Sequence, residues 1–298
     1  MTHPTSQGRL SGLSAMCLLL AIYLAWFLIP PLWQGATPGE GSGTEGLAGM
    51  ASTLWPEVIL AGSILAFAVF DGDWRGLHAT TPLNRHWWLW LIPVVLYLGF
   101  VGSVGMIMMA AAGEAAFAPE ITQILLVVVL TTFLVGIFEE FLFRGFVYRA
   151  LDRWKGPIVA FFLSSILFGS MHYVNWVGGQ SLGQTHNQVL HAAGAGLLYA
   201  GLMLKCGSIW VPVLVHGAWD AVVSFNQTMG GLVAAAAPTE EATPAIEAPT
   251  AEAGAAVAAD PGLLGALIQG LVTGYEPLYG LLLFILWYRS RRSASAVA

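Results

Sequence analysis

Residues 138–144 have the sequence Phe-Glu-Glu-Phe-Leu-Phe-Arg, which places three charged side chains inside an otherwise apolar run. Charged groups at membrane depth are costly and rare, and they usually mark a functional site. On a helix, Glu140 and Arg144 are one turn apart and share a face, so we expect them to form an ion pair. Glu139 points about 100° away from Glu140 and has no partner at helical spacing.

The composition predicts an all-α, polytopic membrane protein. Of the 298 residues, 57% are hydrophobic and only 9% are charged, whereas soluble domains carry about 25% charged residues. A membrane-spanning helix needs about 20 apolar residues. We count eight such segments, at roughly 10–30, 54–70, 86–111, 121–150, 157–175, 188–204, 208–228 and 262–288. We expect the first to be a retained helix, because it is too long for the apolar part of a signal peptide.

These segments suggest four regions of the chain. Residues 1–121 would hold the first three spanning helices, and residues 122–228 would form a catalytic core of four helices. Residues 229–261 are rich in Ala, Pro and Glu and have little to bury, so we expect a disordered loop. Residues 262–298 would form the last helix, interrupted near Glu276-Pro277, and a basic tail. The lipid bilayer is the expected partner, and nothing predicts binding to nucleic acid.

The positive charges predict the orientation in the membrane. Apart from Arg144, all Lys and Arg residues fall on alternate loops or on the two tails. The loops 34–53, 112–120, 176–187 and 229–261 contain none. By the positive-inside rule, both termini are therefore cytoplasmic and the Ala/Pro/Glu-rich loop is outside.

Two further polar motifs lie within apolar segments. The fifth segment contains Phe-Gly-Ser-Met-His, ending at His172, and the seventh contains His-Gly-Ala-Trp-Asp, from His216 to Asp220. The last two residues share a helix face. Counted at about 1.5 Å per residue from the turn near Lys155, Glu139 and His172 lie at matching heights. We expect these groups to converge in one intramembrane cavity, nearer the cytoplasmic side.

Each motif also has a simpler interpretation. Glu140 and Arg144 could form a structural ion pair, and His172 could be a hydrogen-bonded core histidine. His216 and Asp220 could join two helices, a contact of about 1 kcal/mol. Three such costly sites on neighbouring helices are better explained together by function. Four other residues look solvated or interfacial: His186, His191, Glu57 and Glu276.

The ordered set of motifs, Glu-Glu-x-x-x-Arg, Phe-x-x-x-His and His-x-x-x-Asp, resembles the type II CAAX prenyl endopeptidase family. This group of intramembrane proteases, also called CPBP, includes lysostaphin-resistance-like, bacteriocin-immunity and sorting-associated members. The resemblance covers roughly residues 122–228. It implies an intramembrane endopeptidase of the glutamic type that acts on membrane-embedded or lipid-anchored peptides, including C-terminally processed or prenylated ones.

The resemblance also assigns roles to individual residues. Glu139 would be the catalytic glutamate and His172 its partner in activating water, with Glu140 and Arg144 completing the first motif. His216 and Asp220 would face the oxyanion. Many family members have Asn at the last position, and an ionised Asp cannot donate a hydrogen bond to an oxyanion. Asp220 would then be protonated, or it would orient His216 by accepting its ring proton.

Three alternatives remain open. Glu139, His172 and His216 could bind zinc with one open position, although we favour a reaction without metal or other cofactor, in which Glu139 is free to act as base. Intramembrane Glu, His and Asp also form proton relays in transporters, but the chain shows no internal repeat of these motifs. A non-catalytic immunity or sorting scaffold would tolerate the loss of Glu139.

The orientation can be tested with thiol labelling. A cysteine placed in the tract 234–260, in a background without Cys17 and Cys206, should react with a membrane-impermeant thiol reagent added to intact cells. A cysteine in the C-terminal tail serves as the control and should react only after the cells are opened. The reverse pattern would invert the predicted orientation.

Overall fold

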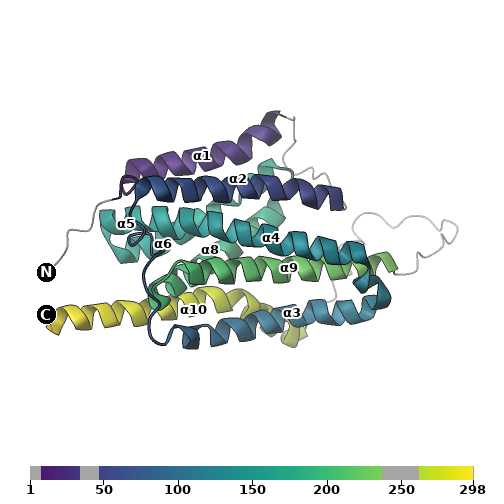
Figure 1. Ribbon diagram of the computed structural model, residues 1–298. Coiled ribbons are helices and arrows are strands. Elements are labelled where there is room, and N and C mark those ends of the chain that lie inside the picture. The colour runs from purple at the N-terminus through teal and green to yellow at the C-terminus, as the bar shows by residue number, and fades with distance from the viewer. Residues whose placement is uncertain (1–7, 34–46, 237–261, 298) are drawn as a thin grey trace.

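The computed structural model describes residues 8–33, 47–236 and 262–297. Within these ranges the chain forms helices joined by turns and contains no strand. The long helices run side by side along one axis, and the two termini lie at the same end of the bundle (Figure 1). The long helices are α1 (Leu13–Trp33), α2 (Leu47–Asp71), α3 (Ile92–Ala112), α4 (Pro119–Glu140), α6 (Pro157–Met171), α8 (Leu182–Cys206), α9 (Trp210–Ala236) and α10 (Gly262–Val297).

The prediction of an all-α polytopic membrane protein is confirmed. In the described part of the chain, six helical segments are long and apolar enough to cross a membrane: Leu13–Pro30, Leu54–Asp71, Trp87–Phe117, Pro119–Lys155, Pro157–Val177 and Leu182–Cys206. The remaining two long helices, α9 and α10, fall outside this criterion. Nevertheless, α9 and the C-terminal part of α10 run alongside the other helices of the bundle (Figure 1).

Four helices, α4, α6, α8 and α9, form the centre of the bundle. Helix α8 packs against α6, α9 and α10, and α4 packs against α9 and α2. On the outside, α3 covers α9, and α1 contacts the short helices α5 (Tyr148–Lys155) and α7 (Val174–Val177). The predicted core of four helices therefore corresponds to α4, α6, α8 and α9.

Glycines allow the central helices to approach closely. A Cβ atom at Gly136 on α4 would lie 2.8 Å from the carbonyl oxygen of Val213, and one at Gly217 on α9 would lie 3.2 Å from that of Thr132. Larger side chains at either glycine would push the two backbones apart. Small residues are the usual means of close helix packing in membranes, where no hydrophobic force draws helices together. Because Gly217 adjoins His216, this crossing sets the height of His216 against α4.

The helix that carries the acidic motif changes its winding directly after Glu140. Residues Phe141–Val147 form η3, a π-helical segment with wider turns, and α5 continues from there to Lys155. All seven residues of η3 are buried. π-Helical turns are rare and frequently lie at functional sites. Gly156, with φ of 83°, then makes the predicted turn into α6.

Two predictions for the C-terminal part of the chain are wrong: the start of the disordered tract and the interruption of the last helix. The tract expected to be disordered, 229–261, begins with helix, because α9 continues to Ala236, and its remainder lies outside the described residues. The expected interruption of the last span is absent, since α10 runs through Glu276 and Pro277 without a break. Proline is tolerated inside membrane helices, where neighbouring groups can satisfy the freed carbonyl.

An ion-pair network closes the end of the bundle where the termini lie. The guanidinium of Arg149 donates to Asp71 at 2.6 Å and lies 3.4 Å from Asp73, and Arg153 lies 3.3 Å from Asp73. The backbone N–H of Leu10 donates to the same Asp71 carboxylate at 2.6 Å. These contacts connect the start of α1 and the end of α2 to α5.

Candidate active site

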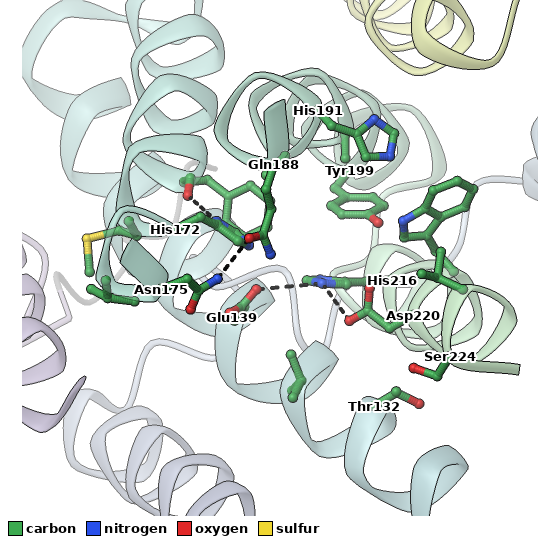
Figure 2. A pocket seen from close by; sticks show the side chains of 18 of the residues that line it. Thr132, Glu139, His172, Asn175, Gln188, His191, Tyr199, His216, Asp220 and Ser224 are labelled. Carbon is green, nitrogen blue, oxygen red and sulfur yellow. Dashed lines mark hydrogen bonds and ion pairs between the residues drawn. The ribbon is translucent and has the colours of Figure 1, made fainter. Parts of the chain in front are cut away.

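The three motifs predicted to converge do so around one large cavity. The cavity has a volume of about 1100 Å³, slightly above the usual range of about 300–1,000 Å³ for ligand pockets. Glu139, His172, His216 and Asp220 all line it, as Figure 2 shows. They come from α4, the end of α6, and α9.

Glu139, Tyr199 and His216 form the floor of this cavity, which is its end nearest to the termini. On α4, α8 and α9 the lining residues extend from Glu139, Tyr199 and His216 toward the end of the bundle opposite the termini. Along α9 they reach Gln227, roughly 16 Å from His216. The cavity therefore extends away from the end with the termini, and its expected position nearer the cytoplasmic side stays a prediction. The buried side chains of η3 fill the space on that side.

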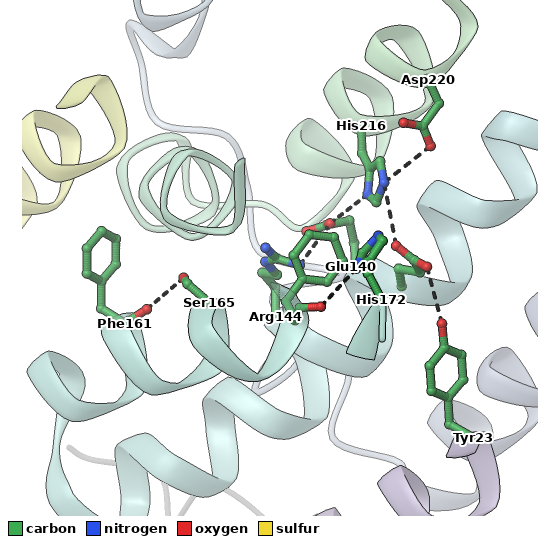
Figure 3. Close-up of polar contacts among 10 residues, drawn as sticks. Tyr23, Glu140, Arg144, Phe161, Ser165, His172, His216 and Asp220 are labelled. Carbon is green, nitrogen blue, oxygen red and sulfur yellow. Dashed lines mark hydrogen bonds and ion pairs between the residues drawn. The ribbon is translucent and has the colours of Figure 1, made fainter. Parts of the chain in front are cut away.

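Glu140 lies below the floor of the cavity and contacts both Arg144 and His216. Its Oε1 accepts a hydrogen bond from Arg144 Nη1 at 3.1 Å, and His216 Nδ1 lies 2.9 Å from the same oxygen (Figure 3). The side chains of Glu140 and Arg144 are both 0% exposed. The predicted ion pair is thus confirmed, and Glu140 has a second contact that the sequence did not predict. It holds the imidazole of α9 against α4.

Two aromatic rings cover the guanidinium of Arg144. Its carbon Cζ lies 4.2 Å from the ring centre of Phe168 and 5.3 Å from that of Tyr199. Cations are attracted to the faces of such rings. Tyr199 also stacks on His216, with ring centres 4.8 Å apart. The rings therefore hold the side chains of Arg144 and His216, both of which contact Glu140.

His216 faces carboxylates on both sides of its ring. Whereas Nδ1 contacts Glu140, Nε2 lies 3.6 Å from Glu139 Oε2 and 3.4 Å from Asp220 Oδ2. Ionised carboxylates only accept hydrogen bonds, and an imidazolium has two N–H donors. The arrangement therefore fits a protonated His216. The predicted pairing of His216 with Asp220 on one helix face is confirmed.

His172 follows the last residue of α6 and has its own orienting contact. Its Nδ1 lies 3.1 Å from the carbonyl oxygen of Phe168. Since a carbonyl oxygen can only accept, Nδ1 carries the proton, and Nε2 of the neutral ring is left as an acceptor. His172 and Glu139 share the cavity, and no hydrogen bond between them is present in the described part of the chain.

Two residues predicted to be solvated or interfacial belong to a second polar pair near the cavity. His191 on α8 lines the cavity wall, and its Nδ1 lies 3.4 Å from Oε2 of Glu276 on α10. Glu276 is only 1% exposed. Glu57, also predicted to be interfacial, lines the cavity from α2. Of the four residues, His186 alone stays at the surface, where it contacts the Tyr173 hydroxyl at 2.8 Å.

Sequence reasoning could have found some of these residues. An acidic residue inside an apolar segment, such as Glu276, is a functional candidate by default, and its position beside a proline led to the wrong interpretation. Tyr23, which lines the cavity from α1, and Tyr199 carry no such signal, because tyrosine is uncharged. Only the packing of α1 and α8 against the site reveals them.

The side chains predicted as alternative zinc ligands are not arranged as a metal-binding cluster. In the described ranges, no group of three or more His, Cys, Asp or Glu side chains is arranged to hold a metal. The predicted alternative ligands Glu139, His172 and His216 therefore line one cavity without forming a ligand cluster.

Comparison with known families gives a match for the central part of the chain. Residues 121–222 match the model of the family described as type II CAAX prenyl endopeptidase Rce1-like. This confirms the resemblance predicted from the motifs, and the matched segment contains all six predicted site residues. No curated protein and no solved structure matches the chain.

The double contact of Glu140 predicts a large effect on stability. Glu140→Gln would leave Arg144 without a compensating charge and would remove the carboxylate beside His216 Nδ1. Breaking a buried ion pair costs about 3–5 kcal/mol. We expect a markedly lower melting temperature in detergent and loss of function through unfolding. Glu114→Gln, on an exposed residue of η2 (Gly113–Phe117), is the matched control. Equal melting temperatures for the two variants would contradict the assignment.

Proposed function

We propose that this chain, whose residues 121–222 match the model of the Rce1-like type II CAAX prenyl endopeptidase family, is an intramembrane endopeptidase of the glutamic type. Its substrates would be membrane-embedded or lipid-anchored peptides, including C-terminally processed or prenylated ones. The observation that carries the proposal is the position of Glu139. Its side chain is 13% exposed, at the floor of a cavity large enough for a peptide segment.

Amide hydrolysis requires a base, an aimed water molecule and a group that stabilises the oxyanion. Glu139 accepts a proton from water while the water oxygen attacks the peptide carbonyl carbon. His172 orients this water through its free Nε2. When the C–N bond breaks, the proton held by Glu139 passes to the leaving amine, which restores the carboxylate.

His216 stabilises the negative charge that develops on the carbonyl oxygen. Its position beside Glu139, with Glu140 holding the opposite nitrogen at 2.9 Å, supports this role. A fixed cation in a site of low dielectric stabilises an oxyanion without reorganising. Asp220 could be protonated and donate to the oxyanion, or it could be ionised and orient His216. The distance of 3.4 Å between its Oδ2 and His216 Nε2 supports the orienting role.

The missing internal repeat of the motifs favours a protease over a proton-coupled transporter. Below Glu139, the side chains of Glu140, Phe143 and Arg144 are 0% exposed and separate the cavity from the end with the termini. No observation favours a non-catalytic scaffold, which would not need Glu139 at the floor.

If both termini are cytoplasmic, the cavity extends toward the outer face of the membrane. Loops without Lys or Arg, such as 112–120, lie at that end. Substrates would then reach Glu139 from the outer leaflet or from the outside. The labelling of tract 234–260 therefore also decides from which side a substrate approaches.

Replacement of Glu139 should separate activity from stability. Glu139→Gln removes the base but leaves an oxygen that can still accept the hydrogen bond from Tyr23. We expect turnover of a quenched fluorescent peptide to fall about a hundredfold or more. The melting temperature should be unchanged or higher, because a neutral amide costs less to bury than a carboxylate. Near-normal turnover of this variant would overturn the proposal.

Removal of metal tests the zinc-dependent alternative. Purified protein treated exhaustively with a chelator should keep its activity, since Glu139 and His172 activate water directly. Zinc content would be measured by mass spectrometry before and after treatment. Stoichiometric zinc in active protein, with activity lost on removal and restored on addition of zinc, would establish the alternative instead.

A further inference from the structure

Tyr23, on α1 and outside the segment 121–222, contacts the proposed base. Its hydroxyl donates a hydrogen bond to Oε1 of Glu139 at 3.3 Å (Figure 3). Its side chain is buried and borders the cavity. We propose that Tyr23 is a positioning residue for Glu139, fixing the orientation of the carboxylate; this rests on the proposed function.

The ring of Tyr23 is held in place from two sides. Its centre lies 4.7 Å from that of Phe27, one turn along α1, and 4.7 Å from that of Phe138 on α4. Phe138 directly precedes Glu139, so the same two residues of α4 contact the ring and the hydroxyl. The hydroxyl therefore has little freedom to turn away from the carboxylate.

The carboxylate of Glu139 is held at both oxygens by different helices. Tyr23 on α1 holds Oε1, and His216 on α9 lies 3.6 Å from Oε2. A carboxylate that is free to rotate presents its lone pairs to water in many directions, and general-base catalysis depends on the heavy-atom geometry of proton transfer. With Oε1 fixed, the plane of the carboxylate is set relative to His216 and the cavity.

This arrangement gives α1 a function in the site. The motifs of α4, α6 and α9 place the base, the water-orienting histidine and the cation. They do not by themselves hold both oxygens of Glu139. The hydrogen bond from Tyr23 connects the N-terminal part of the chain directly to the reacting group.

The test is Tyr23→Phe in the full-length protein, which keeps the ring and removes only the donor. Tyr279→Phe is the matched control, because its hydroxyl donates to the Trp90 carbonyl oxygen at 2.9 Å and does not contact Glu139. The probes are three quenched fluorescent peptides. The first has an S-farnesylated cysteine as the fourth residue from its C-terminus, and the second lacks this farnesylated cysteine. The third contains an internal apolar span. Turnover and melting temperature are measured for each protein.

We expect kcat of Tyr23→Phe to fall about tenfold, since a hydrogen bond to a charged group is lost. KM should stay within about twofold, because the shape of the cavity is kept and the bond acts on the reacting group alone. The melting temperature should match that of Tyr279→Phe. A residue that only supports the fold would lower the melting temperature or raise KM.

Three outcomes would overturn the inference. Turnover of Tyr23→Phe equal to that of the unaltered protein would remove the role of the hydrogen bond, provided that Glu139→Gln is inactive. A raised KM with unchanged kcat would make Tyr23 a substrate contact instead. If the unaltered protein cleaves none of the peptides, or Glu139→Gln cleaves them normally, the proposed function fails and the inference fails with it.

Discussion

The contact of Glu140 with Arg144 and His216 is the interaction on which the rest of the site depends. One buried carboxylate oxygen accepts from a guanidinium of its own helix and lies 2.9 Å from an imidazole of another. Inside a membrane, none of these groups could be buried alone without a large desolvation cost. Their mutual contact therefore fixes α9 against α4 and sets the position of His216, around which Glu139 and Asp220 gather.

Close helix packing makes this contact geometrically possible. Gly136 and Gly217 bring the backbones of α4 and α9 together, and Gly196 on α8 leaves room for the guanidinium, since a Cβ there would lie 3.0 Å from Arg144 Nη2. The π-helical turns of η3 begin directly after Glu140 and bury Arg144 beneath the cavity floor. Polar side chains and small residues thus lie at the same helix crossings, because buried charges need close partners.

The site also draws on helices outside the segment that matches the family. Tyr23 from α1 reaches Glu139, and Glu276 from α10 lies against His191 in the cavity wall. The core helices supply the proposed reacting groups, whereas the surrounding helices contact these groups and shape the cavity. A chain with the same motifs and different outer helices would keep the reacting groups and lose these contacts.

The sequence by itself determined the membrane class, the all-helical fold and the six residues of the three motifs, because charges in apolar segments and helical spacing are local properties. It also determined the pairing of Glu140 with Arg144 and of His216 with Asp220, each one turn apart. Only the tertiary structure decided the contact between Glu140 and His216, the hydrogen bond from Tyr23, and the burial of Glu276 against His191. It also decided the direction in which the cavity extends. These features depend on which helix faces meet, and neither composition nor spacing encodes the distance between residues that lie far apart in the chain.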